Sequence, residues 1–286
     1  MEIKTRTLYL VGTPIGNLGD MTYRAVEVLQ GVDFIAAEDT RNAMKLLNHF
    51  EIKKPLISYY QHNKRERGEM IISRMQKGET CALITDAGMP AISDPGEELC
   101  ALCHEKGIAV SPIPGPCAAV CALASSGLAS GKFAFEGFLS TATKSRREHL
   151  KKTANLEYTM IFYEAPHKLH RTLYDMYEAW GDRRIVLARE ITKMYEEIVQ
   201  TTLSEAIEKY KKITPRGEFV LVIEGASPAH ETMTITDEEA GNIIQELIDT
   251  GLSRTDAVKE AAKMTGKSRN ELYAIAIRER ERAADE

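Results

Sequence analysis

The chain has 286 residues, of which 43% are hydrophobic and 28% are charged, and its formal net charge is −5 at pH 7. This composition excludes a chain that is disordered as a whole, and it restricts any nucleic-acid contact to local basic patches. No apolar run is long enough to span a membrane, and the N-terminal residues lack a signal-peptide pattern. We therefore expect a soluble, cytoplasmic protein.

Apolar runs rich in β-branched residues alternate with helical periodicity over roughly the first 115 residues. Strands are expected at Thr7–Val11, Val32–Ala37, Pro55–Tyr59, Cys81–Thr85 and Ile108–Pro112, with helices at Tyr23–Gln30, Thr40–His49, Lys64–Lys77 and Asp94–Lys106. Regular alternation of strands and helices is typical of a doubly wound α/β domain whose sheet is mainly parallel.

The pattern changes after the segment Pro114-Gly115-Pro116, where two prolines around a glycine stop any helix or central strand. The elements that follow are expected at Cys117–Ser125, Phe133–Phe138, Lys144–Thr153, Tyr158–Tyr163, Lys168–Trp180, Arg184–Arg189, Glu197–Leu203, Ser204–Lys212 and Phe219–Glu224. Strands alternate less regularly with helices here, so we predict a mixed sheet. The predicted α/β domains are residues 1–114 and 115–229.

Residues 230–286 are predicted to form a third, helical unit, with helices at Asp237–Asp249, Ser253–Met264 and Ser268–Arg280. Ser253 with Asp256 and Ser268 with Glu271 fit the capping box, a signature of helix starts. Two short helices joined across Thr265-Gly266-Lys267 are typical of a helix-turn-helix, although any helical hairpin has the same pattern.

Five cysteines occur, at positions 81, 100, 103, 117 and 121. The pairs Cys100/Cys103 and Cys117/Cys121, with His104, have spacings compatible with a zinc site. Both pairs lie in segments rich in alanine and leucine, where the same spacings place small apolar residues on one helix face. We expect packed thiols and no metal.

Two glycine- and proline-rich loops follow predicted strands, at Gly12–Asp20 and Thr85–Gly96. The first has neither the G-x-G-x-x-G spacing of dinucleotide sites nor a P-loop ending. Stiff loops at the carboxyl edge of an α/β sheet are a common place for small-molecule binding. The loops are expected to form one side of a cleft between the two domains. Polar residues directly after strands of the second domain are expected to close this cleft: Tyr163, Glu164, His167, Arg189, Glu190, Thr192 and Lys193.

Basic residues gather in three clusters that are candidate phosphate contacts, although each could equally be a solvated helix face. They are Lys64, Arg65 and Arg67; Lys144, Arg146, Arg147, Lys151 and Lys152; and the segment from Arg254 to Arg282.

Eight motifs, in order and spacing, resemble those of the ribosomal RNA small subunit methyltransferase I family, a branch of the tetrapyrrole methylase superfamily. They are TLYLVGTPIGNLGDMTYRAVEVL, AAEDTRNAMKLL, LITDAGMPAISDPG, PIPGPCAAVCALASSGL, FEGFL, FYEAPHKL, ARE-ITK and GEFVLVIEG. The resemblance implies two α/β domains, with S-adenosylmethionine in the cleft between them, and a helix-turn-helix extension. It also implies 2′-O-methylation of a cytidine, cytidine-1402, in 16S rRNA of the small ribosomal subunit, and a homodimer.

The resemblance also implies which residues line the cofactor site: Pro14, Asp86, Ala87, Gly88, Met89, Ile92, Gly115, Cys117, Ala118, Tyr163, Glu164, Ala165, Arg189 and Glu190. Met89 stands where the family usually has threonine and Cys117 where it has serine, so side-chain hydrogen bonds at these two positions are in doubt. A ribose hydroxyl is a poor nucleophile unless its proton is accepted. Glu190, Lys193 and Asp86 are the candidates for that role.

Two other functions remain open at this stage. One is methylation of a tetrapyrrole-like small molecule, which would leave the basic helices and the helical tail without a purpose. The other is a non-catalytic regulator that reads nucleic acid with its helix-turn-helix, against which the acidic composition argues.

Overall fold

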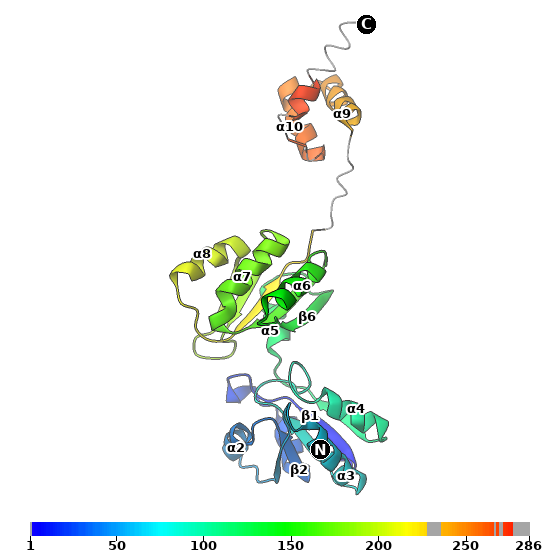
Figure 1. Cartoon of the computed structure of the whole chain (residues 1–286), viewed down its shortest axis with the longest axis vertical. Helices are drawn as coiled ribbons and strands as arrows, with labels where there is room; N and C mark the ends of the chain where they lie inside the picture. The colour runs from blue at the N-terminus through cyan, green and yellow to red at the C-terminus, as the bar shows by residue number, and fades with distance from the viewer. Residues whose placement is uncertain (1, 228–235, 266, 269–270, 277–286) are drawn as a thin grey trace. The chain divides into compact units, whose positions relative to one another are not determined.

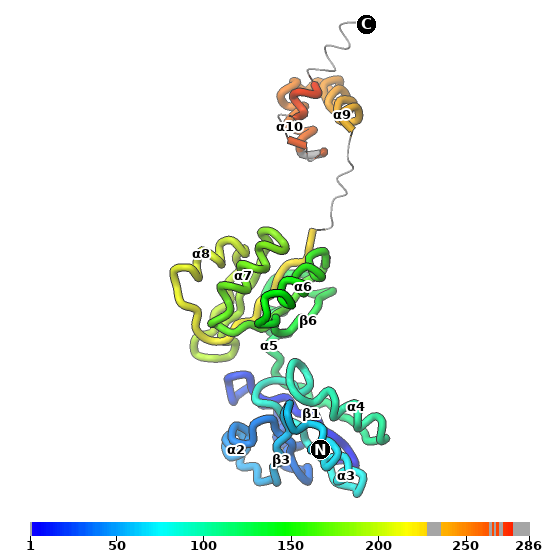
Figure 2. The backbone as a smooth tube through the Cα atoms, in the orientation of Figure 1, coloured from blue at the N-terminus to red at the C-terminus, as the bar shows by residue number. Residues whose placement is uncertain are grey.

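The structure, a computed structural model, describes residues 2–227, 236–265, 267–268 and 271–276. Residues 1–225 form one compact unit, and the residues from Ala226 onward form a second. The first unit contains two five-stranded sheets. Figure 2 traces the path of the backbone through this unit.

Five parallel strands form the first sheet, in the order β3-β2-β4-β1-β5. They are β1 (Thr7–Val11), β2 (Phe34–Ala37), β3 (Leu56–Ser58), β4 (Cys81–Ile84) and β5 (Ala109–Ile113). The connecting helices are η1 (Leu18–Asp20), α1 (Tyr23–Gly31), α2 (Thr40–His49), α3 (Lys64–Gln76) and α4 (Glu97–Glu105). The predicted parallel sheet is confirmed.

Helices cover both faces of this sheet because successive side chains of a strand point to opposite faces. In β1, Tyr9 and Val11 pack with α1 and α2, whereas Leu8 packs with α3 and α4. Strands β2 and β4 are buried along their whole length, as their continuous apolar sequences predict. Because all five strands are parallel, their carboxyl ends lie at the same edge of the sheet.

The second sheet is mixed, in the order β6-β7-β10-β8-β9, as predicted. Its strands are β6 (Phe133–Phe138), β7 (Thr159–Glu164), β8 (Arg184–Arg189), β9 (Glu197–Thr202) and β10 (Phe219–Ile223). Only the β6–β7 pair is parallel among these neighbours. The helices are α5 (Ala118–Ser126), α6 (Thr143–Thr153), α7 (Pro166–Trp180) and α8 (Leu203–Lys212).

The two faces of the second sheet have different cores. Phe219, Leu221 and Ile223 of β10 pack with α6, α7 and α8, which lie along one face in Figure 1. Val220 and Val222 point to the opposite face and pack with α5. The chain passes from the first sheet to the second between Ile113 and Ala118. The division of this unit at 114/115 stays a prediction.

The second unit has helices α9 (Asp237–Asp249) and α10 (Arg254–Thr265), followed by a helical stretch at residues 271–276. Ala240, Ile244, Val258, Leu272 and Ile275 belong to a core of its own. Both predicted capping pairs are hydrogen-bonded, and a third pair, not predicted, caps α9. The predicted boundary at 229/230 and the last residues of the predicted third helix, 277–280, lie outside the described residues.

Candidate active site

The loops after β1 and β4 are joined by backbone hydrogen bonds. The amide of Thr13 donates to the carbonyl of Gly88 over 3.0 Å, and the amide of Gly88 donates to the carbonyl of Thr13 over 3.1 Å. The Thr13 hydroxyl donates to the carbonyl of Thr85 over 3.1 Å. These bonds fix the relative position of the two loops at the carboxyl edge of the first sheet.

The link between the sheets passes close to the backbone of the β1 loop at Gly115. A Cβ on Gly12 would lie 2.7 Å from the Cα of Gly115, so both positions require glycine. Gly115 therefore supports the wall of the site, and it is not one of the residues that line the cavities described next. Its predicted direct contact with the cofactor stays a prediction.

Cavity 1, of about 490 Å³, lies where the first sheet's loops face the strand ends of the second sheet. It brings together most of the residues predicted for a cofactor site: Asp86, Ala87, Gly88, Met89, Ile92, Cys117, Ala118, Tyr163, Glu164, Ala165 and Glu190. Lys193, a predicted candidate for chemistry, also lines it. Its volume lies within the range of about 300–1,000 Å³ that is common for small-molecule sites.

Cavity 2, of about 410 Å³, adjoins cavity 1 on the side of α2. Its lining combines the β1 loop, the end of β4 and α2: Thr13, Pro14, Ile15, Gly16, Leu18, Asn42, Ala43, Lys45, Leu46, Ile84, Thr85, Asp86, Ala87, Lys193 and Glu218. Five of these also line cavity 1: Ile15, Asp86, Ala87, Lys193 and Glu218. The two cavities therefore meet at a shared wall that carries Asp86 and Lys193.

Two residues predicted to contact the cofactor lie elsewhere. Pro14 lines cavity 2 and not cavity 1. Arg189 pairs with Glu197, its partner in the β8–β9 register, with 3.0 Å between Nε and Oε2. The guanidinium is thus paired within the second sheet and does not line cavity 1, and its predicted contact with the cofactor stays a prediction.

Three carboxylates line cavity 1 on the side of the first sheet. Burial and the neighbouring charge of Asp86 raise the pKa of Glu38. Burial, followed by the charges of Glu38 and Asp86, raises the pKa of Asp94 to about 6. Crowded carboxylates favour protonation or a cation between them. This wall is suited to a positively charged ligand.

A second charged cluster lies opposite, in the loop after β8. The Glu190 Oε1 atom accepts hydrogen bonds from Lys193 Nζ and from the amide of Glu218, both over 2.9 Å. Burial raises the pKa of Glu190, but these two bonds outweigh it and lower the pKa below its usual value. Burial lowers the pKa of Lys193, but Glu218 and Glu190 outweigh it and raise that pKa. Lys193 is therefore a cation at neutral pH, which argues against a role as a base.

Backbone strain is concentrated around cavity 1. Positive φ angles, which non-glycine residues rarely adopt, occur at Ala91 (66°), Ser93 (63°), Glu190 (50°) and Thr192 (68°). Such conformations cost of order 1–3 kcal/mol each and cluster at functional sites. The strained turn at Glu190 directs Lys193 to the cavities.

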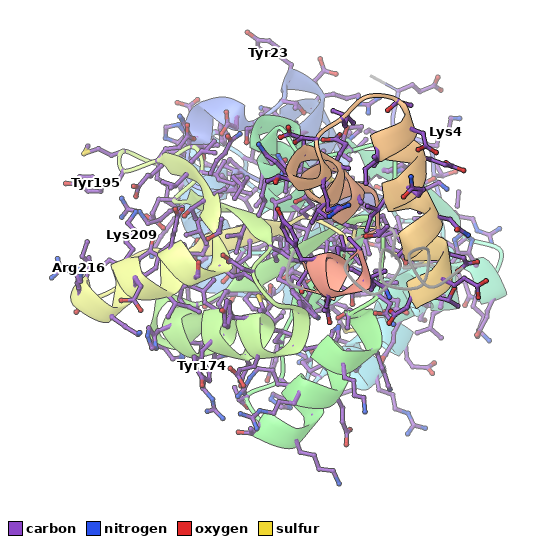
Figure 3. All side chains as sticks on the ribbon, turned by 90° about the horizontal axis from the view of Figure 1, so that it is seen from above. Lys4, Tyr23, Tyr174, Tyr195, Lys209 and Arg216 are labelled. Atoms are coloured by element: carbon purple, nitrogen blue, oxygen red, sulfur yellow. The ribbon has the colours of Figure 1, made fainter. Side chains whose placement is uncertain are left out.

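The tip of the same loop points away from the protein. Met194 and Tyr195 are 90% and 69% exposed, and Figure 3 shows the Tyr195 side chain extending outward from the ribbon. Only the residues at the base of the loop, among them Glu190, Ile191 and Lys193, line cavity 1.

Aromatic rings form the side of cavity 1 that belongs to the second sheet. The Tyr163 hydroxyl accepts a hydrogen bond from the amide of Ala119 over 3.2 Å, and burial raises its pKa to about 12. The Phe138 ring packs edge-on against Tyr163, with 5.4 Å between ring centroids, yet Phe138 is 56% exposed. An exposed ring at a cavity wall can stack on a planar ligand.

Glu164 is part of the wall, but its carboxylate is occupied. It accepts hydrogen bonds from the amide of Ala165, over 2.8 Å, and from the hydroxyl of Thr172. Its side chain is 3% exposed. We conclude that Glu164 shapes the start of α7 more than it offers a charge to a ligand.

Among the residues that line cavity 1 but were not predicted for the site are Glu38, Asp94 and Phe138. Glu38 directly follows β2 and Asp94 lies in the loop after β4, so both obey the rule of polar residues at the carboxyl ends of strands. Phe138 ends β6 within the FEGFL motif.

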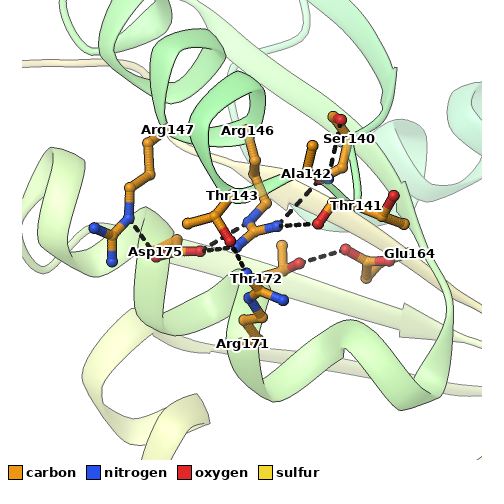
Figure 4. Close-up of polar contacts among 10 residues, drawn as sticks. All are labelled: Ser140, Thr141, Ala142, Thr143, Arg146, Arg147, Glu164, Arg171, Thr172 and Asp175. Atoms are coloured by element: carbon orange, nitrogen blue, oxygen red, sulfur yellow. Dashed lines mark hydrogen bonds and ion pairs between the residues drawn. The ribbon is translucent and has the colours of Figure 1, made fainter.

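The second basic cluster is not uniformly exposed, and the prediction that Arg146 contacts phosphates needs correction. Arg146 is 3% exposed and donates from Nε to Asp175 Oδ2 over 2.7 Å. Its Nη1 donates to the carbonyls of Ser140 and Thr141 (Figure 4). Arg147 also donates to Asp175, over 3.2 Å, but its side chain is 64% exposed.

Arg146 is therefore expected to act on stability, and Arg147 is its matched control. Arg146→Ala should lower the free energy of unfolding by about 3–5 kcal/mol, because it leaves the Asp175 charge buried without its main partner. Arg147→Ala should cost less than about 1 kcal/mol, as is usual for exposed pairs. Urea unfolding of both variants measures the difference. Equal losses would contradict the distinction between a buried and a surface pair.

The first basic cluster has partners on the surface. Lys64 pairs with Glu98, and Arg67 contacts the sulfur of Met70 over 3.8 Å. Arg65 is exposed. The phosphate contacts predicted for this cluster, and for Lys144 and Arg147, stay predictions. The third cluster extends from Arg254 past the last described residue.

The cysteines are free thiols, with Cys81 and Cys103 buried and Cys121 exposed. The prediction that all five thiols are packed is therefore wrong for Cys121. Within the described ranges no group of three or more metal-ligating side chains occurs. Within the same ranges, every helix is too short or too polar for a membrane span.

Residues 7–207 match the family model described as Tetrapyrrole (Corrin/Porphyrin) Methylases, and residues 235–280 match the one described as RsmI C-terminal HTH domain. The ribosomal RNA small subunit methyltransferase I of Synechocystis sp. is 48% identical over 271 residues, which cover 94% of this chain and 97% of that protein. The chain belongs to the ribosomal RNA small subunit methyltransferase I family. The Bacillus subtilis protein of that name is 43% identical over 274 residues, covering 93% of this chain and 92% of its own.

Two solved structures show that the fold of this methyltransferase is shared more widely. A cobalt precorrin-4 methyltransferase has a TM-score of 0.57 at 17% identity, covering 77% of this chain and 95% of its own. Diphthine synthase has a TM-score of 0.58 at 14% identity, covering 77% of this chain and 90% of its own. The predicted two-sheet tetrapyrrole methylase fold with a helix-turn-helix-like extension is thus confirmed.

Proposed function

We propose that this methyltransferase uses S-adenosylmethionine to methylate the ribose 2′-oxygen of a cytidine, cytidine-1402, in 16S rRNA of the small ribosomal subunit. One observation carries the proposal: two cavities meet at a wall that holds Asp86 and Lys193. Methyl transfer requires the donor carbon and the acceptor oxygen to be held in contact, which adjoining donor and acceptor sites achieve. The names of the relatives supply the RNA and the subunit.

The residues of cavity 1 suit S-adenosylmethionine by their charges and by the aromatic rings among them. The carboxylates of Glu38, Asp86 and Asp94 face a site where the cofactor would place its positive sulfonium and amino groups. Phe138 and Tyr163 offer rings to its planar base. When bound, the cofactor supplies an electrophilic methyl group.

Residues of the shared wall would accept the proton of the ribose hydroxyl and stabilise the charge that develops on its oxygen. Asp86 lies at the boundary of both cavities, and its Oδ2 accepts a hydrogen bond from Asn42 Nδ2 over 3.0 Å, which orients the carboxylate. We assign to Asp86 the acceptance of the ribose hydroxyl proton. Lys193, a cation held by Glu190 and Glu218, stabilises the negative charge that develops on the attacking oxygen.

The remaining parts of the proposal concern partners. Arg65, Lys144 and Arg147 are the basic side chains best placed for phosphates, and the C-terminal unit would add a further contact with the ribosomal subunit. A homodimer in the cytoplasm completes the proposal, on the strength of the family resemblance.

Gly88 tests the cofactor site. Gly88→Ala should weaken S-adenosylmethionine binding about tenfold, because Gly88 lines cavity 1 with φ +84° and a side chain there would strain the loop that forms the cavity wall. Gly107→Ala is the matched control, since Gly107 has φ +64° and open space around it. Calorimetric titration of both variants gives the affinities, and equal affinities would refute the assignment.

Asp94 gives cofactor binding a pH dependence. Its pKa is raised to about 6, so the carboxylate is mostly protonated at pH 5 and mostly ionised at pH 7. A cationic cofactor prefers the ionised form, so its affinity should rise about fivefold to tenfold between these pH values. Asp94→Asn should remove most of the rise, whereas Glu97→Gln, at an exposed position of α4, should not. A rise that persists unchanged in Asp94→Asn would exclude this role.

The cellular test uses small-subunit RNA from cells that lack the protein. Loss of one 2′-O-methylated cytidine from 16S rRNA, restored by the gene in trans, is the expected result. Fully methylated RNA in the deletion strain would favour the two alternatives, methylation of a tetrapyrrole-like molecule or a regulator without catalysis.

A further inference from the structure

Cavity 2 contains a polar group that the fold itself does not use. Thr85 lines the cavity and is 5% exposed, and its Oγ1 atom has no hydrogen-bond partner among the described residues. A buried hydroxyl without a partner is costly, so such groups are usually satisfied by a ligand or by water.

A cationic side chain from α2 also lines cavity 2. Asn42 and Lys45 are three residues apart on α2, so they share one helix face, and both line cavity 2. Lys45 is exposed, and within the described part of the chain it has no hydrogen-bond or ion-pair partner. Arg41, on the preceding turn, is by contrast paired with Asp39. Lys45 is thus a free cation at the rim of a polar cavity.

We infer that cavity 2 is the acceptor pocket, which receives the target nucleotide of the RNA with Thr85 hydrogen-bonded to the nucleoside and Lys45 paired with a flanking phosphate. This inference rests on the proposed function and adds the residues that recognise its substrate. The volume of about 410 Å³ suits one nucleotide taken out of its stack. The shared wall then places the nucleotide beside cavity 1, with Asp86 and Lys193 between donor and acceptor.

The experiment measures methyl transfer to small ribosomal subunits from cells lacking the enzyme, together with S-adenosylmethionine affinity and thermal unfolding. Thr85→Val should lower kcat/KM for subunits about fivefold to tenfold, while cofactor affinity stays within twofold. Its melting temperature should be unchanged or higher, because the substitution removes an unpaired buried hydroxyl. Thr85→Ser should restore activity.

Lys45→Ala should raise KM for subunits about fivefold and reduce the salt dependence of binding by about one phosphate contact. Lys53→Ala, an exposed lysine of the same domain that does not line either cavity, is the matched control. If both Thr85→Val and Lys45→Ala methylate subunits as the wild type does, the assignment of cavity 2 as the acceptor pocket is overturned, while the proposed function stands. A wild-type protein that methylates no subunit RNA would overturn the proposed function, and the assignment with it.

Discussion

Replacing Gly217 by alanine is expected to lower the rate of methyl transfer about a hundredfold. Gly217 has φ +82°, and an added Cβ would lie 2.5 Å from Cγ and 2.7 Å from Cδ of Glu190. Glu190 would have to leave Lys193 and the amide of Glu218, which it now holds through Oε1. Displacement of about 1 Å in a group near the reaction is enough for such a loss.

The control for this variant is Gly181→Ala. Gly181 also has a positive φ, of +73°, but no atom lies within 4 Å of an added Cβ. Gly181 lies at φ 73° and ψ −164°, a region that favours glycine, so the variant should lose stability through backbone strain and still retain the wild-type rate. Single-turnover measurements with subunits compare the two variants, and a Gly217→Ala rate within twofold of wild type would remove Glu190 and Lys193 from the proposed mechanism.

Deleting residues 230–286 is expected to lower methylation of ribosomal subunits tenfold or more and to leave cofactor binding near normal. All residues of both cavities lie in the first compact unit, and the C-terminal helices have a separate core. Binding energy from a remote module can position the reacting ribose, and a tenfold loss corresponds to about 1.4 kcal/mol.

A paired assay on the truncated protein separates the possible roles of the tail. Full methylation activity would contradict a docking role. Loss of cofactor binding as well would show that the tail belongs to the fold of the first unit or to the dimer.

The layers of the fold were predictable because side-chain alternation is a local signal. Thr7–Val11 was expected as a strand and is β1 with the same bounds. Phe219–Ile223 alternates between two cores, and its uniformly apolar sequence indicates a strand buried on both faces. The site loops were predictable from another local signal, because the segment around Gly88 is rich in turn residues and lies between a strand and a helix.

The corrections arose where tertiary contacts decide a residue's role. Arg146 shares its helix face with Leu150 and Thr153, all three buried, so its position four residues before a core leucine was a signal of burial. Its partner Asp175 lies on another helix and could not be identified from spacing. The pairing of Arg189 with Glu197 likewise depends on strand register.

The central claim is tested most directly by incubating the purified protein with labelled S-adenosylmethionine and small subunits from cells that lack it. Nuclease digestion followed by mass spectrometry then identifies the labelled nucleoside. We predict a single product, 2′-O-methylcytidine, formed by the wild type and reduced at least tenfold in Asp86→Asn, with cofactor binding measured in parallel. Label on a base, on another nucleoside or on no RNA at all would contradict the claim.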